Sequence, residues 1–249
     1  MTALLIVLLA GIAAGALNSV GGGGSFVAFP ALVAVGVTAV TANAATTVAL
    51  LPGGLASLWV YRRDLEPLPS TSIRVLTATS VVGGAVGAAL LLALPSNSFD
   101  AVVPWLLAFA TFVLAFGRRI ASALRTTVAG RPVIMAGQLL LSIYGGYFGG
   151  ASGLMMVAFW SVAASIDPGR VNPLRMAQMA AIYLTAAVVF LLASDVLTES
   201  AKLGLMLGGA ILGGYGGATI ARKLPTPVLR AIVVGSAAAM TVVYFAVNS

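Results

Sequence analysis

Two stretches of small residues in this sequence would place backbone N–H groups where they can bind an anion. Four consecutive glycines, Gly21 to Gly24, stand within Asn18 to Ser25, and a shorter run, "GGASG", covers Gly149 to Gly153. Strongly apolar segments flank both runs. Where a helix begins after such a break, its first N–H groups have no intrahelical partner, and the aligned peptide dipoles place partial positive charge there. Two converging helix starts would therefore bind a small anion without a charged side chain.

The candidate binding residues come from the two breaks and from the helices expected after them. Ser25 lies where it would cap the first returning helix or donate outward, and Ser152 is the expected N-cap of the second. Because a mid-helix Thr also bonds its own backbone, structural and binding roles stay open for Thr46, Thr47 and Gln178. The complete candidate set is Asn18, Ser19, Gly21, Gly22, Gly23, Gly24, Ser25, Asn43, Thr46, Thr47, Gly149, Gly150, Ser152, Gly153 and Gln178.

Arg175 is the charged residue nearest to these helix starts. It is expected to anchor the topology, or to attract an anion at the cytoplasmic mouth of the site. Tyr144 and Tyr147 lie near the second break and are equally compatible with a structural role.

The residue types on which enzymes and metal sites depend are scarce. The chain of 249 residues contains no cysteine and no histidine, which removes thiol chemistry, disulfides and the commonest metal ligands. No nucleophile–base pair and no cluster of metal ligands occurs away from the expected loops. We therefore expect no catalytic residue, no metal site and no cofactor, and we do not expect an enzyme.

The elements that carry these residues are expected to be membrane-spanning helices. Hydrophobic residues make up 60% of the chain and charged residues 8%, whereas soluble domains carry roughly 25% charged residues. Apolar runs of about 20 residues recur, and that length crosses a hydrocarbon core about 30 Å thick. The predicted spans are 41–61, 72–94, 101–117, 173–194, 201–221 and 228–247.

The charged residues predict which loops face the cytoplasm. Twelve of the 13 lysines and arginines fall at every second connection, whereas Asp100, Asp195 and Glu199 occupy the intervening ones, beside Lys202. By the positive-inside rule the basic loops are cytoplasmic, in a multi-pass protein of the cytoplasmic membrane. This placement of the net charge of +7 also argues against nucleic acid as a partner. The twelve are Arg62, Arg63, Arg74, Arg118, Arg119, Arg125, Arg131, Arg170, Arg175, Arg222, Lys223 and Arg230.

The apolar segments beside each break are shorter than the other spans. As helices, residues 3–18 and 25–38 would reach about 24 Å and about 21 Å, and residues 132–148 and 153–166 form a similar pair. Each pair is therefore expected to form a broken hairpin. Because tilting and bilayer thinning let short helices cross, the sequence leaves re-entrant and fully crossing hairpins open. Both arrangements put the N-terminus outside, and the last span puts the C-terminus outside.

An internal repeat relates the two halves of the chain. The matching pairs are Gly15–Gly146, Gly22–Gly153 and Asp64–Asp195 at an offset of 131, and Gly83–Gly213, Gly84–Gly214 and Gly87–Gly217 at an offset of 130. Each half then holds one broken hairpin and three spans, and because three is odd, the second half enters the membrane upside down. Inverted repeats with broken helices are typical of secondary transporters, whose site lies near the midplane.

The expected fold class is therefore an all-α polytopic membrane protein with two inverted-topology repeats, each a broken helical hairpin plus three transmembrane helices. Residues 1–249 form a single transporter domain, with repeat 1 at 1–118, a cytoplasmic linker at 119–131 and repeat 2 at 132–249. Glycines within the spans are expected to let helices pack closely rather than bind substrate. They are Gly83, Gly84, Gly87, Gly208, Gly209, Gly213, Gly214, Gly216 and Gly217.

The stretch "GALNSVGGGGSFVAFPALVAVGVTAVTANAATTVALLPGG" resembles the first-half signature of the TauE/SafE (sulfite exporter) family. In that family a glycine-rich break precedes an apolar leg with a proline and then a helix that opens with an Ala-x-x-Thr-Ser-like element, here Asn43 to Thr47. The stretches "GGYFGGASGLMMVAFW" and "NPLRMAQMAAIYL" are similar to the family's second copy. Two departures bear on the substrate: the second break has fewer glycines, and Ala177-Gln178 stands where a Gly-Thr or Ala-Thr pair is common.

The resemblance implies a secondary transporter that exports sulfite, organosulfonates such as sulfoacetate, or related sulfur anions across the cytoplasmic membrane, with the two breaks forming the site. Anion export from a negative cytoplasm runs downhill by about 2.3 kcal/mol per charge per 100 mV. Because the spans hold no carboxylate or histidine to carry a coupled proton, we expect potential-driven uniport or exchange. A passive anion channel and an importer of a related anion are the alternatives. The expected partners are a small anionic substrate and the lipid bilayer; a homo-oligomer is left open.

Overall fold

The computed structural model describes residues 2–21, 23–68, 71–123, 130–166 and 170–221, together with 235, 238 and 242. Within these ranges the secondary structure is helical, apart from an isolated bridge between Leu68 and Thr71. This confirms the all-α class. Apart from residues 235, 238 and 242, the predicted span 228–247 lies outside the described residues. The elements are α1 (Thr2–Gly21), α2 (Ser25–Ala34), α3 (Ala39–Tyr61), α4 (Ile73–Ala93), α5 (Ser96–Ala123), α6 (Arg131–Tyr147), α7 (Ser152–Ala163), α8 (Asn172–Ala193), the 3₁₀ helix η1 (Asp195–Glu199) and α9 (Ser200–Ala221).

Among the described residues, α3, α4, α8 and the η1–α9 segment are long and apolar enough to cross a membrane. They agree closely with four predicted spans. α5 differs, because it begins at Ser96 and runs to Ala123, past both ends of the predicted span 101–117. The apolar run marks only part of this helix, whose first turn is closed by a bond from the Ser98 N–H to the Pro95 carbonyl, 2.9 Å long. Residues 119–123 of the predicted linker are therefore helical.

The legs of the two hairpins are unequal. α1 has 20 residues and spans about 30 Å. It is longer than predicted because the helix continues through Gly21, and glycine is well tolerated where a helix ends. The predicted end of this leg at residue 18 is therefore wrong, although its apolar part, Thr2–Asn18, is one of the shorter apolar helices. The returning helices are short, as predicted: α2 has 10 residues and α7 has 12, or about 15 Å and about 18 Å.

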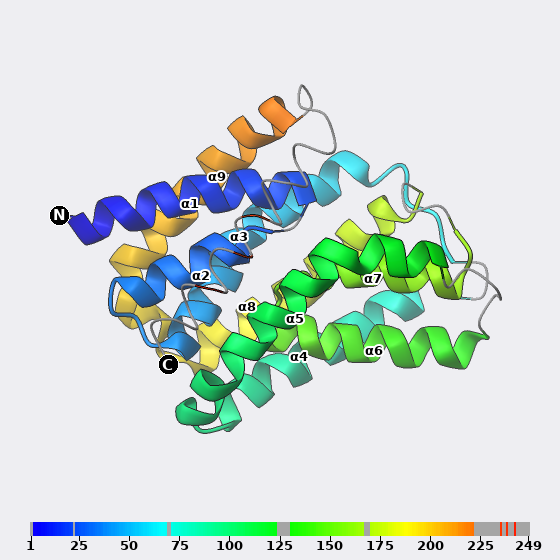
Figure 1. The fold of residues 1–249 in the computed structure, drawn as a ribbon, viewed down its shortest axis with the longest axis horizontal. Coiled ribbons are helices and arrows are strands. Elements are labelled where there is room, and N and C mark those ends of the chain that lie inside the picture. Colours follow the sequence, from blue (N-terminus) through cyan, green and yellow to red (C-terminus); the bar gives the residue numbers. More distant parts are fainter. Residues whose placement is uncertain are drawn as a thin grey trace.

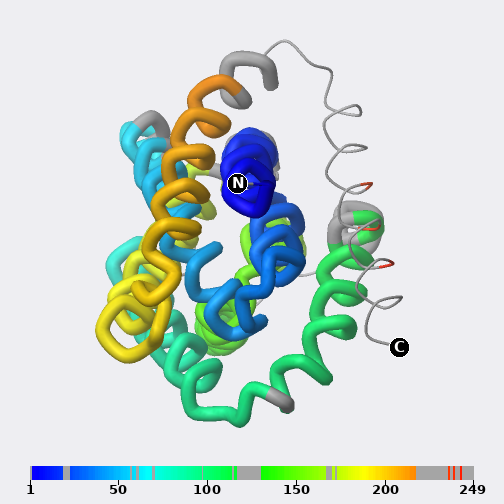
Figure 2. Tube along the Cα trace, turned by 90° about the vertical axis from the view of Figure 1, so that its left-hand side faces the viewer, coloured from blue at the N-terminus to red at the C-terminus, as the bar shows by residue number. Residues whose placement is uncertain are grey.

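Each of the two main helix pairs joins a helix of the first half to a helix of the second half. α1 packs along α9 and α4 packs along α6. Figure 1 shows these pairs at opposite edges of the molecule with α3 and α8 between them, and Figure 2 shows α1 beside α9 from the side. α1 and α6 open the two halves, whereas α4 and α9 hold equivalent places in them. This arrangement, together with the contact between α3 and α8, is what an internal repeat predicts.

Glycines hold both pairs at close range. A Cβ on Gly87 of α4 would lie 2.1 Å from the carbonyl oxygen of Ile143 in α6, and a Cβ on Gly213 of α9 would lie 1.8 Å from that of Ile12 in α1. Ile12 and Ile143 are related by the offset of 131 residues, so equivalent positions meet in both halves.

The packing role predicted for the span glycines is confirmed at five positions. Gly208 and Gly216 have no neighbour in reach of a Cβ, and Gly214 has only an ordinary contact with Gly15. The surroundings of Gly217 lie outside the described residues. The five confirmed glycines are Gly83, Gly84, Gly87, Gly209 and Gly213.

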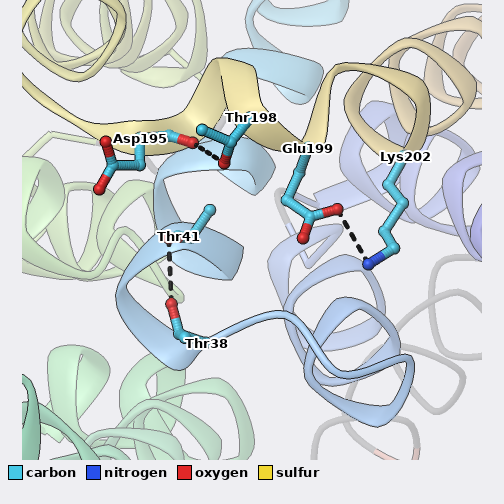
Figure 3. Close-up of polar contacts among 6 residues, drawn as sticks. All are labelled: Thr38, Thr41, Asp195, Thr198, Glu199 and Lys202. Atoms are coloured by element: carbon cyan, nitrogen blue, oxygen red, sulfur yellow. Dashed lines mark hydrogen bonds and ion pairs between the residues drawn. The ribbon is translucent and has the colours of Figure 1, made fainter.

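Polar contacts mark the two ends of the helix bundle. At one end Arg170, just before α8, lies 3.3 Å from Glu66, just after α3. Figure 3 shows the other end, where Thr38 and Thr41 at the start of α3 lie beside η1, and Lys202 pairs with Glu199 at 2.9 Å. α3 and α8 therefore run in opposite directions, as inverted repeats require. The end that faces the cytoplasm stays a prediction.

Candidate substrate-binding site

The first break is a short turn between α1 and α2. The N–H groups of Phe26 and Val27 donate to the carbonyls of Gly23 and Gly24 at 3.2 and 3.1 Å, so these two groups are already bonded within the turn. A Cβ on Gly24 would lie 2.4 Å from the Ala14 carbonyl oxygen, which explains a glycine where α2 crosses α1. Gly21 belongs to α1, and Gly22 lies outside the described residues, as do the side chains of Ser19 and its neighbour Val20.

Ser25 is the first residue of α2, and Gly24 holds the N-cap position without a side-chain cap bond. The Ser25 hydroxyl is buried and has no hydrogen-bond partner among the described residues. Within the described part of the chain, this hydroxyl is therefore an unsatisfied polar atom at the first break.

The second break reverses the chain through two residues with positive φ. Gly149 has φ +79° and Ala151 has φ +58°, a conformation that glycine adopts without strain. The prediction that Ser152 is the N-cap is wrong, because Ala151 occupies that position and Ser152 is the first residue of α7. The left-handed Ala151 delays the helix start by one residue. The Ser152 hydroxyl instead donates to the Gly149 carbonyl at 2.8 Å.

Two tyrosine hydroxyls donate hydrogen bonds to the backbone carbonyls of this break. Tyr183 of α8 donates to the Gly149 carbonyl at 3.2 Å, and Tyr144 of α6 donates to the Gly150 carbonyl at 2.8 Å. The first bond of α7 runs from the Met155 N–H to the Ala151 carbonyl. The carbonyl groups of the break are thus hydrogen-bonded to side chains. Its N–H groups lie at the start of α7, where the helix dipole places partial positive charge.

The first turns of α3 connect the first half of the chain to the second break. The Asn43 amide donates to the Tyr147 carbonyl at the end of α6, at 2.8 Å. Thr47 donates to the backbone carbonyl of Asn43 at 3.1 Å, which is the structural alternative. The Thr46 hydroxyl is buried without a partner among the described residues.

Gln178 lies in a buried polar network between α4, α6 and α8. Its amide oxygen accepts from Ser80 at 2.8 Å, and its amide nitrogen donates to Thr77 at 3.2 Å. Gln138 of α6 donates to the same Ser80 hydroxyl at 2.7 Å and to Ser142 at 3.4 Å. These bonds assign Gln178 a role in helix packing.

A small cavity lies where the two halves meet. Its volume is about 30 Å³, and it extends from the middle of α3 and α8 toward the first turn of α8. Among the predicted residues, Asn18, Gly153 and Arg175 line it, so it joins the end of α1 to the start of α7. The other candidate residues do not line it. The full lining is Asn18, Leu51, Gly54, Gly153, Arg175, Met176, Met179, Ala180 and Tyr183.

Arg175 is the cation of this cavity. It is only 6% exposed, so it is a buried residue rather than one at an open mouth. A Cβ on Gly153 would lie 2.9 Å from its Nη1 atom, which places the guanidinium against the first turn of α7. The positive charge and the positive end of a helix dipole thus meet in one place, and both favour an anion there.

The sequence pattern missed Tyr183, Met176 and Met179. On α8, Met176 follows Arg175 by one residue, Met179 by four and Tyr183 by eight, so a helical projection from Arg175 would have found Met179 and Tyr183. A tyrosine and methionines within an apolar span do not otherwise indicate that they line a cavity.

Long apolar helices, two interrupted hairpins and a cavity between the halves define a polytopic helical membrane protein of the transporter class. The family model described as Sulfite exporter TauE/SafE matches residues 7–244, nearly the whole chain. The chain therefore belongs to the TauE/SafE family of membrane transporters, as its resemblance to that family predicted. None of the curated proteins compared with the chain matches it.

Proposed function

We propose that this protein is a secondary transporter that exports small sulfur-containing anions, such as sulfite and sulfoacetate, across the cytoplasmic membrane. The observation that carries the proposal is the cavity that joins Asn18, at the end of α1, to Gly153, at the start of α7. It brings residues of both breaks to one place beside a buried arginine. Membership of the TauE/SafE family supports sulfur anions as the substrate class.

In this mechanism the anion lies near the middle of the membrane, in the cavity between the end of α1 and the start of α7. The side-chain amide of Asn18 would donate from the first half, and the Gly153 N–H group at the start of α7 would donate from the second. Rocking of the halves against each other would then expose the anion to either side in turn.

The proposal is tested by reconstituting the purified protein in liposomes and measuring sulfite flux as the sulfite concentration rises. A transporter saturates, whereas flux that stays proportional to concentration favours the alternative of a passive anion channel. A protein that moves sulfite only inward would favour the alternative of an importer.

The first break is tested by Gly23→Val, which adds a branched side chain to a buried turn where α2 begins. We expect sulfite flux to fall at least about tenfold, the effect of losing roughly 1.4 kcal/mol of binding, while the protein still inserts. Gly216→Val is the matched control, because Gly216 has open space around it. Equal flux in both variants would show that the first break is not part of the binding site.

A further inference from the structure

The cavity between the two halves has walls of unlike character. Arg175, Asn18 and the start of α7 at Gly153 form a polar wall, whereas the thioethers of Met176 and Met179 face the same space beside aliphatic residues of α3 and α8. A ligand that carries a charged group and also an apolar or polarisable part would match this lining.

Contacts with the polar groups hold both thioethers in place. The Nη2 atom of Arg175 lies 3.5 Å from the Met176 sulfur, and the Ser152 hydroxyl oxygen lies 3.4 Å from the Met179 sulfur. Ser152 itself is tied to the Gly149 carbonyl. The sulfur atoms thus keep a fixed position relative to the guanidinium and the second break.

The chemistry of these groups selects among anions. A guanidinium presents a planar fork of N–H donors that matches two oxygens of a sulfur oxyanion, whereas a thioether is soft, polarisable and a weak acceptor. An oxygen turned toward the thioethers would lose its water without gaining a donor, which costs free energy. Sulfate and phosphate have an oxygen at every corner, but a sulfonate has a carbon and sulfite has a lone pair at one corner.

We infer that Arg175 binds the charged group of the substrate and that Met176 and Met179 make the site selective for sulfite and small alkanesulfonates over sulfate and phosphate. This inference rests on the proposed function and adds to it the residues that set affinity and selectivity.

The role of Arg175 is tested with the full-length protein in nanodiscs, by calorimetric titration with sulfite and with methanesulfonate. Arg175→Gln is expected to weaken both affinities about 10- to 100-fold, the effect of losing a charged hydrogen bond. Arg170→Gln is the matched control, because Arg170 lies five residues earlier, is exposed and pairs with Glu66; its affinities should equal those of the wild type. Arg175→Lys keeps the charge without the fork, so it should bind about tenfold more weakly than the wild type, and it tests the inference if Arg175→Gln does not fold.

Selectivity is tested by the ratio of the methanesulfonate and sulfate affinities. Met179→Gln places an amide donor in the apolar wall and is expected to lower this ratio about tenfold, mainly by improving sulfate binding. Met179→Leu keeps the wall apolar and should keep the ratio. A Met179→Gln ratio equal to that of the wild type would overturn the selectivity role.

The result separates this inference from the proposed function. If Arg175→Gln binds and transports sulfite like the wild type, or if Arg170→Gln loses as much, Arg175 is not the ligand although the transporter remains one. If the wild-type protein neither binds nor moves any of these sulfur anions, the proposed function fails and this inference fails with it.

Discussion

Asn43 and Thr47 lie one turn apart on α3, and the structure uses their polar atoms differently. Asn43 reaches across to the Tyr147 carbonyl beside the second break, whereas Thr47 bonds a carbonyl of its own helix. Both are buried polar residues in the same apolar stretch. Of these two residues, Asn43 is therefore the one that couples the first half of the chain to the second break.

This difference predicts unequal effects of two substitutions of similar volume. Asn43→Leu removes a buried bond between helices and leaves the Tyr147 carbonyl without this donor, so the free energy of unfolding should fall by about 0.5–1.5 kcal/mol. Thr47→Val removes a bond within one helix and should change it by less than about 0.5 kcal/mol. Unfolding in mixed micelles by added SDS measures both. Equal losses would show that the bond between the helices has no special weight.

At the scale of the helices, neighbouring glycines of α9 have unlike surroundings. A Cβ on Gly209 would lie 2.5 Å from the Leu8 carbonyl oxygen of α1, whereas a Cβ on Gly208 would meet nothing within 4 Å. Close backbone contact of this kind is how small residues stabilise helix pairs in membranes. The α1–α9 pair depends on the glycines that face α1 rather than on the glycine content of α9.

Gly209→Ala should therefore destabilise the protein by about 1–3 kcal/mol, because α1 and α9 must move apart. Gly208→Ala should be neutral or stabilise by up to about 1 kcal/mol, because alanine is the better helix former. The midpoint of thermal unfolding in detergent compares them. A Gly209→Ala protein as stable as the wild type would contradict the close packing of this pair.

The two sides of the molecule are held by different forces. On the α4–α6–α8 side, Gln138, Ser80 and Gln178 share hydrogen bonds. The positions equivalent to Gln138 and Ser80 on the other side are Val7 and Ala210, which are buried and apolar. The repeat thus keeps its helix pairs while the chemistry between them differs.

At the scale of the whole molecule, the loops predicted to share a side do meet. Arg170 contacts Glu66 at one end, and η1 lies against the start of α3 at the other. Since the chain has no cysteine, single cysteines report sidedness cleanly.

Asp64→Cys and Thr198→Cys place a thiol in the exposed connection after α3 and in exposed η1. We expect a membrane-impermeant maleimide applied to intact cells to label the cysteine at position 198, whereas the cysteine at position 64 should react only after the membrane is opened, because the arginine-rich loops are predicted to be cytoplasmic. The cysteine-free wild type is the control for background labelling. Reversed labelling would invert the predicted topology.

The driving force is also a property of the whole molecule. If one negative charge crosses with each monoanion, 100 mV contributes about 2.3 kcal/mol, or close to a fiftyfold accumulation. In liposomes with an imposed potassium diffusion potential, sulfite should therefore accumulate on the positive side. Accumulation that ignores the potential would argue against electrogenic transport, and liposomes without protein give the leak.

The sequence alone determined the membrane environment, the helices α3, α4, α8 and α9, and the two places where the helices break; the internal repeat stays a prediction with which the helix pairs agree. These follow from local composition: long apolar runs must bury in lipid, and clustered glycines weaken a helix wherever it lies. The family followed from the same stretches. Helix ends were less accurate, as Gly21 and Ser152 show, because the last residue of a helix depends on neighbours that the local pattern does not contain.

Only the tertiary structure decided which candidate residues meet. It placed Asn18, Gly153 and Arg175 around one cavity, assigned Gln178 to a packing network, and brought in Met176, Met179 and Tyr183. The physical reason is that a side chain's partner across a helix interface is set by the rotation and depth of both helices. Those depend on close contacts, such as that of Gly87 with Ile143, between residues far apart in the chain.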